Sequence, residues 1–83
     1  MYSIEFSETA EKQFNKLPKD IQIRIVSSLE RIRIRPQKHV LRLVGSPYFR
    51  LRVGDYRIIL DIRDDKLIIL VIVVGHRRNI YGQ

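Results

Sequence analysis

Apolar side chains follow a strand period at the start of the chain and a helical period directly after it. Residues 2–6 place an aromatic or aliphatic side chain at every second position, as expected of a half-buried strand. Ser7 is then typical of a helix N-cap, because its hydroxyl can accept a hydrogen bond from a backbone N–H of the first turn. A first helix to about residue 16 follows from the helical spacing of Ala10, Phe14 and Leu17.

A second helix is predicted between two prolines. Pro18 cannot continue the first helix but suits the first turn of the next, and the second helix should end before Pro36. Its buried stripe is predicted by the spacing of Ile21, Ile25, Leu29 and Ile32. Residues 36–47 contain two prolines and a glycine with few apolar residues, which favours mostly loop.

The period changes to that of strands in the second half of the chain. Residues 48–53 and 56–63 read as two strands joined by a two-residue turn at Gly54-Asp55, where glycine can adopt positive φ. After a further turn at Asp64-Asp65, residues 66–74 are apolar on both faces, which predicts a central strand. The order β-α-α-β-β-β predicts an α+β fold, in which an N-terminal helical hairpin packs on one face of an antiparallel sheet.

Composition limits the chain to one cytoplasmic domain. A chain of 83 residues buries roughly 60–65% of its unfolded surface, so residues 1–83 are expected to form one domain with one core. The absence of cysteine removes disulfides, a thiol nucleophile and Cys-based zinc sites, and suits a reducing compartment. The longest apolar run has eight residues, far short of the ~20 that cross a bilayer. We therefore expect no membrane, metal, cofactor or small-molecule ligand.

Positive charge is concentrated in the middle third of the chain. The net charge is +7; residues 31–57 alone hold eight Lys or Arg against one acid. Eleven of the sixteen basic residues are arginine, whose planar fork matches phosphate oxygens. A polyanion is the expected partner, and a merely solvated charged face is the simpler alternative.

The predicted turn decides which arginines share a face. A two-residue loop at Gly54-Asp55 places Arg52 opposite Arg57 and puts Arg50 on the same side of the hairpin, away from the core. Like charges opposite one another destabilise a hairpin, so an anion bound there would relieve the repulsion. These side chains could also be ordinary solvent-facing arginines.

The end of the chain adds cations and an aromatic ring. Arg77, Arg78 and Tyr81 follow the last strand, and Arg77 and Tyr81 would lie on one side of a helical turn. A cation that holds the backbone beside a ring that stacks a base is typical of binding to single-stranded RNA. His76 could in principle act as an acid, although a surface role is simpler; His39 lies in the predicted loop.

These segments together resemble a known family. The stretch RLVGSPYFRLRVGDYRIIL from Arg42 to Leu60 and the ending VGHRRNIY from Val74 to Tyr81 are similar to the RelE branch of the RelE/ParE toxin superfamily. The resemblance implies the toxin of a type II toxin–antitoxin pair. It implies a ribosome-dependent endoribonuclease that cuts messenger RNA in the ribosomal A site. Its partners would be a RelB-like antitoxin, whose extended chain wraps around the toxin, and the 70S-type ribosome with its message.

The resemblance also assigns residues. The positions that match the family's catalytic set are Arg57, Arg77 and Tyr81. The basic positions of the first hairpin strand are Arg50 and Arg52, which are expected to bind RNA or the ribosome. We expect the same of Arg42 and Arg78. A ParE-like inhibitor of DNA gyrase and a non-catalytic RNA-binding domain are the alternatives.

Overall fold

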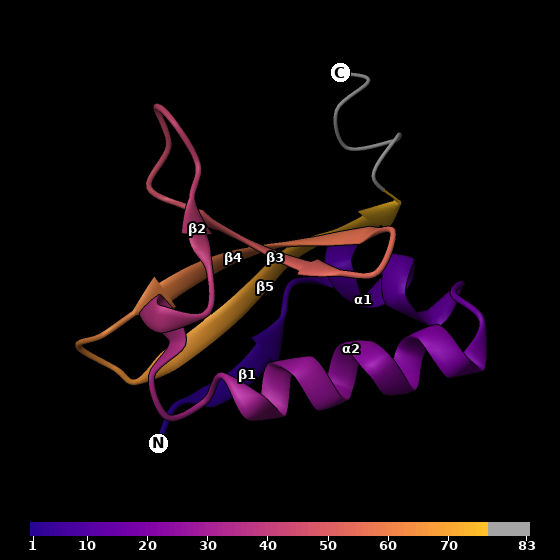
Figure 1. Cartoon of the computed structure of the whole chain (residues 1–83), viewed down its shortest axis with the longest axis horizontal. Coiled ribbons are helices and arrows are strands. Elements are labelled where there is room, and N and C mark those ends of the chain that lie inside the picture. Colours follow the sequence, from indigo (N-terminus) through magenta and orange to yellow (C-terminus); the bar gives the residue numbers. More distant parts are fainter. Residues whose placement is uncertain (77–83) are drawn as a thin grey trace.

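Two helices lie on one side of a five-stranded sheet (Figure 1). The computed structural model describes residues 1–76. In chain order the elements are β1 (Ser3–Phe6), α1 (Glu8–Asn15), α2 (Lys19–Arg31), a short 3-10 helix (Pro36–Lys38), β2 (Leu41–Arg42), β3 (Phe49–Val53), β4 (Tyr56–Arg63) and β5 (Ile68–His76). The predicted α+β arrangement is confirmed, with the helical hairpin on one face.

Local signals at the helix ends act as predicted. The Ser7 hydroxyl accepts a hydrogen bond from the Ala10 N–H at 3.0 Å, and it donates to the carbonyl of Ile72 at 2.9 Å. Pro18 is the N-cap of α2 and so lies one residue before the first turn in which it was expected, and its carbonyl accepts hydrogen bonds from the N–H groups of Ile21 and Gln22. Because Ser7 both caps α1 and contacts β5, it couples the start of the helix to the sheet.

The sheet is mixed rather than antiparallel throughout. Its strand order is β1-β5-β4-β3-β2; β5 pairs antiparallel with β4 but parallel with β1. The central position predicted for the last strand is therefore confirmed. The expectation of a purely antiparallel sheet is wrong at β1, because a helical crossover lets the first strand enter beside the last in either direction.

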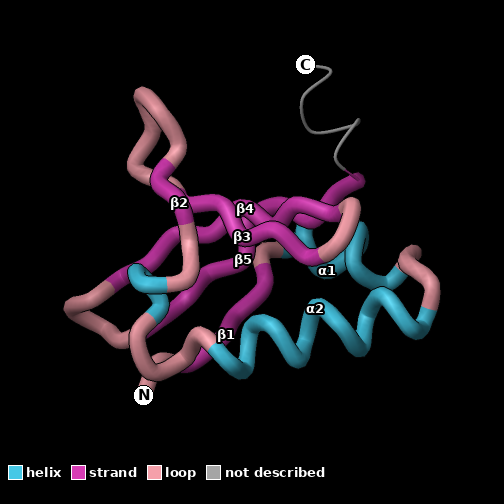
Figure 2. Tube along the Cα trace, in the orientation of Figure 1, coloured by secondary structure: helices cyan, strands magenta, loops and turns pink. Residues whose placement is uncertain are grey.

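Several strand boundaries differ from the predicted ones (Figure 2), and β3 begins at Phe49, one residue after its predicted start. The region expected to be mostly loop contains the two-residue strand β2, which pairs with β3 and adds a fifth strand. The loop between β4 and β5 spans residues 64–67 rather than two residues, and Leu67 in it adopts φ 54°. β5 therefore begins at Ile68, and its end lies two residues beyond the predicted one.

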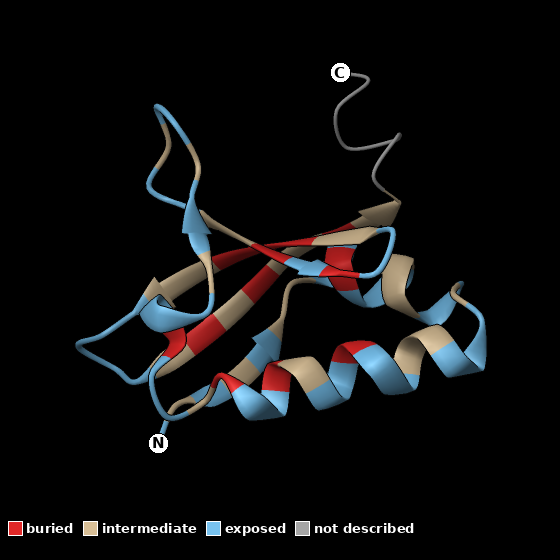
Figure 3. Ribbon diagram, viewed as in Figure 1, coloured by how far each residue is buried: buried red, intermediate tan, exposed pale blue. Residues whose placement is uncertain are grey.

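The core lies between the helices and one face of the sheet (Figure 3). Ile25 and Leu29 of α2 and its C-cap residue Ile32 are buried, as their spacing predicts. From the sheet they meet a set of fully or almost fully buried side chains: Ile58, Leu60, Ile69, Val71 and Val74. Burying one such aliphatic side chain contributes about 1.5–3 kcal/mol. This one-sided core fixes which face of the β3–β4 hairpin turns away from the helices.

Helix α1 secures the C-terminal half of β5. The register between β4 and β5 shifts between Ile59 and Leu60, which places a bulge at Ile72 of β5. Beyond the last residue of β1, the backbone N–H of Val74 donates to the side-chain oxygen of Gln13 at 2.8 Å. The strand that leads to His76 is thus held by α1 where β1 no longer pairs with it.

A polar cluster ties the other end of the sheet together. The hydroxyl of Tyr2 donates to Asp64 Oδ1 at 2.6 Å, and the amide of Gln37 donates to the same oxygen at 2.7 Å. The hydrogen bond from Tyr2 is the largest cause that lowers the pKa of Asp64, and the same bond raises the pKa of Tyr2. The cluster joins the N-terminus, the 3-10 helix and the β4–β5 loop.

Candidate nucleic-acid interface

The β3–β4 turn has the predicted length and geometry. Val53 pairs with Tyr56 and Arg52 pairs with Arg57, so the loop consists of Gly54 and Asp55 alone. Gly54 has φ 58°, a left-handed conformation that glycine adopts without a steric penalty. The alignment of the two arginines across the hairpin is therefore confirmed.

The hairpin separates apolar from basic side chains. Leu51, Val53, Ile58 and Leu60 face the helices and are buried. The opposite surface of the sheet, turned away from the helices, is called the outer face below. By strand register it carries Arg50, Arg52, Arg57, Ile59, Asp61, Arg63, Ile68, Leu70 and Val73.

The arginines of the outer face differ in exposure. Arg52 is exposed, whereas Arg50 and Arg57 are half-buried. The Nε atom of Arg57 is buried, although the residue as a whole is only half-buried. The Nε of Arg52 donates to the carbonyl of Gly54 at 3.2 Å, which bends this side chain toward the turn.

Charge is unevenly distributed along the outer face. At the β4–β5 end Arg63 forms an ion pair with Asp61, with 3.0 Å between Nε and Oδ2. At the opposite end the cross-strand neighbours of Arg57 are Arg52 and Gly75, and neither is acidic. Three arginines thus lie near the β3–β4 turn beside one acid of that turn, Asp55, and this excess of positive charge can attract a phosphate.

Arg42 lies apart from these three arginines. Its register partner on β3 is Phe49, which shares the side of the sheet that faces the helices. The guanidinium carbon of Arg42 lies 5.5 Å from the centre of the Phe49 ring, a cation–π arrangement. The structure thus brings Arg50, Arg52 and Arg57 together and leaves Arg42 on another surface.

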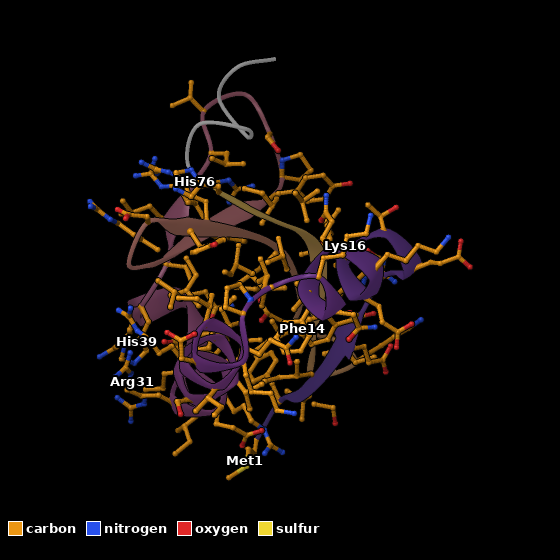
Figure 4. All side chains as sticks on the ribbon, turned by 90° about the vertical axis from the view of Figure 1, so that its right-hand side faces the viewer. Met1, Phe14, Lys16, Arg31, His39 and His76 are labelled. Atoms are coloured by element: carbon orange, nitrogen blue, oxygen red, sulfur yellow. The ribbon has the colours of Figure 1, made fainter. Side chains whose placement is uncertain are left out.

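His76 is also separated from Arg57. It pairs with Tyr56, and the two rings meet edge to face with their centres 5.4 Å apart. Since Tyr56 and Arg57 are consecutive in a strand, they point to opposite faces, and His76 follows Tyr56. Figure 4 shows His76 at the opposite end of the molecule from Met1, and His39 on an exposed loop between them.

Arg77, Arg78 and Tyr81 lie outside the described residues, so two of the three predicted catalytic residues are not placed. A further arginine, unforeseen in the sequence, reaches the hairpin from α2. Both terminal nitrogens of Arg24 lie 3.2 Å from the position that a Cβ on Gly54 would occupy. No local pattern indicates this contact, since thirty residues separate the two positions.

Within residues 1–76, no three His, Asp or Glu side chains are grouped closely enough to hold a metal ion. In the same part of the chain no helix is both long and apolar enough to cross a membrane.

Comparison with known families decides the wider assignment. Residues 4–81 match the family model described as the ParE toxin of the type II toxin–antitoxin system parDE. The chain belongs to this family. The resemblance to the RelE/ParE toxins, first indicated by the hairpin and the C-terminal motif, is confirmed.

Individual relatives fall on the RelE side of the superfamily. Toxin RelG of Mycobacterium tuberculosis (strain ATCC 25618 / H37Rv) is 33% identical over 85 residues, which cover 96% of this chain and 95% of RelG. The mRNA interferase toxin RelE of Escherichia coli (strain K12) is 29% identical over 79 residues, covering 92% and 83%. In the crystal structure of the intact E. coli RelBE toxin–antitoxin complex, a matching chain has a TM-score of 0.79 at 27% identity, with 92% of this chain and 96% of that chain covered.

Proposed function

We propose that the protein is a ribosome-dependent endoribonuclease, the toxin of a type II toxin–antitoxin pair that cuts messenger RNA in the ribosomal A site. The observation that carries the proposal is the meeting of Arg50, Arg52 and Arg57 at one end of the outer face. The name of the E. coli relative, mRNA interferase, supports the same chemistry.

Arginines suit one part of this reaction. The ribose 2′-oxygen attacks the adjacent phosphorus, the bond from phosphorus to the 5′-oxygen breaks, and the phosphorane between them carries extra negative charge. Arg57, which is half-buried with its Nε out of contact with solvent, is proposed to stabilise that charge. Arg50 and Arg52 are proposed to hold and position the strand. None of them can serve as the base, because a guanidinium stays protonated.

The proton transfers fall to other groups. The 2′-hydroxyl loses a proton and the leaving 5′-oxygen gains one. We propose Tyr81 and Arg77 as the other members of the catalytic set, beside Arg57. Ionising a tyrosine with a pKa near 10 costs about 4 kcal/mol at pH 7. Nearby arginines lower such a pKa by roughly one to three units and so reduce this cost. Such a base is weak by itself, so the ribosome is proposed to supply the positioning, and activity on RNA in buffer is expected to be low or absent.

A RelB-like antitoxin is the proposed second partner, with Arg42 and Arg78 as further contacts to RNA or ribosome. β5 presents Ile68, Leu70 and Val73 on the outer face, and all three remain half-buried. An antitoxin chain that covers these side chains and brings acids to the neighbouring arginines would remove both the apolar and the charged surface from water. The matching E. coli RelE chain was solved in complex with its antitoxin. We place the reaction in the cytoplasm, where ribosomes translate.

The matching family model supports a second candidate function. Because that model describes ParE toxins, the second candidate is a ParE-like inhibitor of DNA gyrase that cuts no RNA. A non-catalytic RNA-binding domain is the third possibility. Both would keep the basic hairpin, but neither needs Tyr81.

Mapping of 5′ ends on messages from translating ribosomes tests the proposal. The purified protein is compared with Arg57→Ala, Arg77→Ala and Tyr81→Phe, and each protein is also tested for inhibition of DNA supercoiling by gyrase. We expect new message ends with the parent and their loss in all three variants. If Arg77→Ala stays as toxic as the parent and no message is cut, the nuclease assignment is wrong, and gyrase inhibition would support the second candidate.

A further inference from the structure

The β3–β4 turn is flanked by guanidinium groups from both sides of the sheet. Arg24 approaches from α2, with its terminal nitrogens 3.2 Å from the place of a Cβ on Gly54. Arg52 approaches from the outer face and donates from Nε to the carbonyl oxygen of Gly54 at 3.2 Å. A single residue thus links an arginine on a helix to an arginine on a strand.

The two cations are close enough to act on one ligand. Because Arg24 approaches Gly54 and Arg52 is hydrogen-bonded to it, the terminal nitrogens of Arg24 lie within about 10 Å of the Nε of Arg52. This is about one Debye length at 0.1 M salt, so salt screens the mutual repulsion of the two charges only in part. Within residues 1–76 Arg24 forms no ion pair that would offset this repulsion.

Gly54 leaves room for the end of the Arg24 side chain. Any larger residue would place its Cβ 3.2 Å from both terminal nitrogens, tighter than ordinary van der Waals contact. The Nε of Arg52 is occupied by the Gly54 carbonyl, which leaves its terminal nitrogens to face a ligand. Two guanidinium groups beside the turn suit a phosphate group, because phosphate oxygens accept hydrogen bonds from paired N–H donors.

We propose that Arg24 and Arg52 form a phosphate subsite at the hairpin turn, beside Arg57, and that it binds the backbone of RNA. The inference rests on the proposed function, because it extends the same RNA-binding surface from the outer face around the turn onto α2. Arg24 acts in binding and takes no part in the bond-breaking step. The phosphate belongs either to the message or to ribosomal RNA.

Salt titration of RNA binding tests the subsite. Affinity for a short single-stranded RNA and for programmed ribosomes is measured between 50 and 300 mM salt for the parent, Arg24→Gln, Arg24→Lys and Arg31→Gln. Arg31 is a matched control, because it is exposed, lies on the same helix and sits near the Met1 end, away from His76 (Figure 4). Loss of one contact to single-stranded RNA lowers the slope of log affinity against log salt by about 0.7, or about fivefold in affinity at 0.1 M.

We expect Arg24→Gln to show this lower slope and the weaker affinity. Arg24→Lys should keep the parental slope but bind somewhat more weakly, and Arg31→Gln should behave like the parent. A loss on both RNA ligands assigns the phosphate to the message, and a loss on ribosomes alone assigns it to ribosomal RNA. Equal binding by Arg24→Gln and Arg31→Gln on both ligands would overturn the subsite.

A second measurement needs no variant and covers the case in which Arg24→Gln does not fold. Phenylglyoxal labels exposed arginines, and bound RNA should protect Arg24 of the parent but not Arg31, as read by mass spectrometry. Equal labelling of the two residues with RNA bound would overturn the subsite. Both tests report binding rather than cleavage, so they succeed or fail independently of whether the parent cuts messages on ribosomes.

Discussion

The pairing of Arg52 with Arg57 makes a sharp prediction about stability. Val53 and Tyr56 close the two-residue turn, and Arg52 and Arg57 form the next pair along the hairpin. In such a hairpin this next pair is not hydrogen-bonded through the backbone, and its Cα atoms are about 4.5 Å apart. For a separation of about 7 Å between the two guanidinium groups, Coulomb's law gives a repulsion in water of about 0.6 kcal/mol. Replacing Arg52 by an uncharged residue should therefore stabilise the hairpin by about 0.5 kcal/mol, within the range of cross-strand pairs.

Thermal unfolding of Arg52→Gln and Arg52→Lys measures this effect. Both variants alter the hydrogen bond from Nε to Gly54, but only the lysine variant keeps the charge. For a chain of this length about 0.5 kcal/mol corresponds to about 2–4 °C, so Arg52→Gln should melt that much above Arg52→Lys at 10 mM salt. At 1 M salt the Debye length is about 3 Å, and the difference should vanish.

Two results would refute the reasoning. Arg52→Gln could melt at or below Arg52→Lys in low salt, or its advantage could persist unchanged in 1 M salt. The first would mean that the two guanidiniums do not repel measurably, and the second that the gain is not electrostatic. The same variant should bind RNA more weakly than the parent, because the charge that destabilises the hairpin is the charge that holds phosphate.

Further predictions concern the framework that holds the hairpin. Ser7→Ala removes the hydrogen bonds to the N–H of Ala10 and the carbonyl of Ile72. It should lower the free energy of unfolding, measured by urea denaturation, by about 1–2 kcal/mol. An unchanged midpoint of denaturation would contradict the capping role. Leu60→Ala empties a fully buried site on β4 and should cost about 2–5 kcal/mol in the same assay, while a loss below about 1 kcal/mol would mean that the site collapses. The lowered pKa of Asp64 contributes stability above its ordinary value of 3.8 that is lost as the pH falls through the lowered pKa. The raised pKa of Tyr2 contributes stability below 10.0 that is lost as the pH rises through the raised pKa. The stability gap between the parent and Tyr2→Phe should thus be widest between these limits, and a constant gap from pH 2 to 11 would contradict the pairing.

Features that depend on neighbouring residues could be predicted from the sequence. Ser7 as a cap, the buried stripe of α2 and the two-residue turn at Gly54 each follow from local geometry, and each is confirmed. The alignment of Arg52 with Arg57 then follows from the turn alone, because strand period two leaves no other register. This part of the candidate site was therefore predictable.

Features that depend on distant parts of the chain were not predictable. β1 pairs with β5 across more than sixty residues, and no local pattern sets its direction, so the parallel pairing was missed. The two acids after β4 resemble a tight turn, whereas the chain takes a longer loop with Leu67 in a left-handed conformation. The approach of Arg24 to Gly54 likewise depends on how α2 crosses the sheet.

The most direct test of the central claim compares one message in two settings. A defined message is incubated with the purified protein either in the A site of a stalled ribosome or alone in the same buffer, and the rate of cleavage is measured in each. We predict rapid cleavage on the ribosome, little or none in buffer, and a loss of about 100-fold for Arg57→Gln on the ribosome, as expected when one preorganised group that stabilises transition-state charge is removed. An intact message on the ribosome, or equal rates in the two settings, would contradict the account.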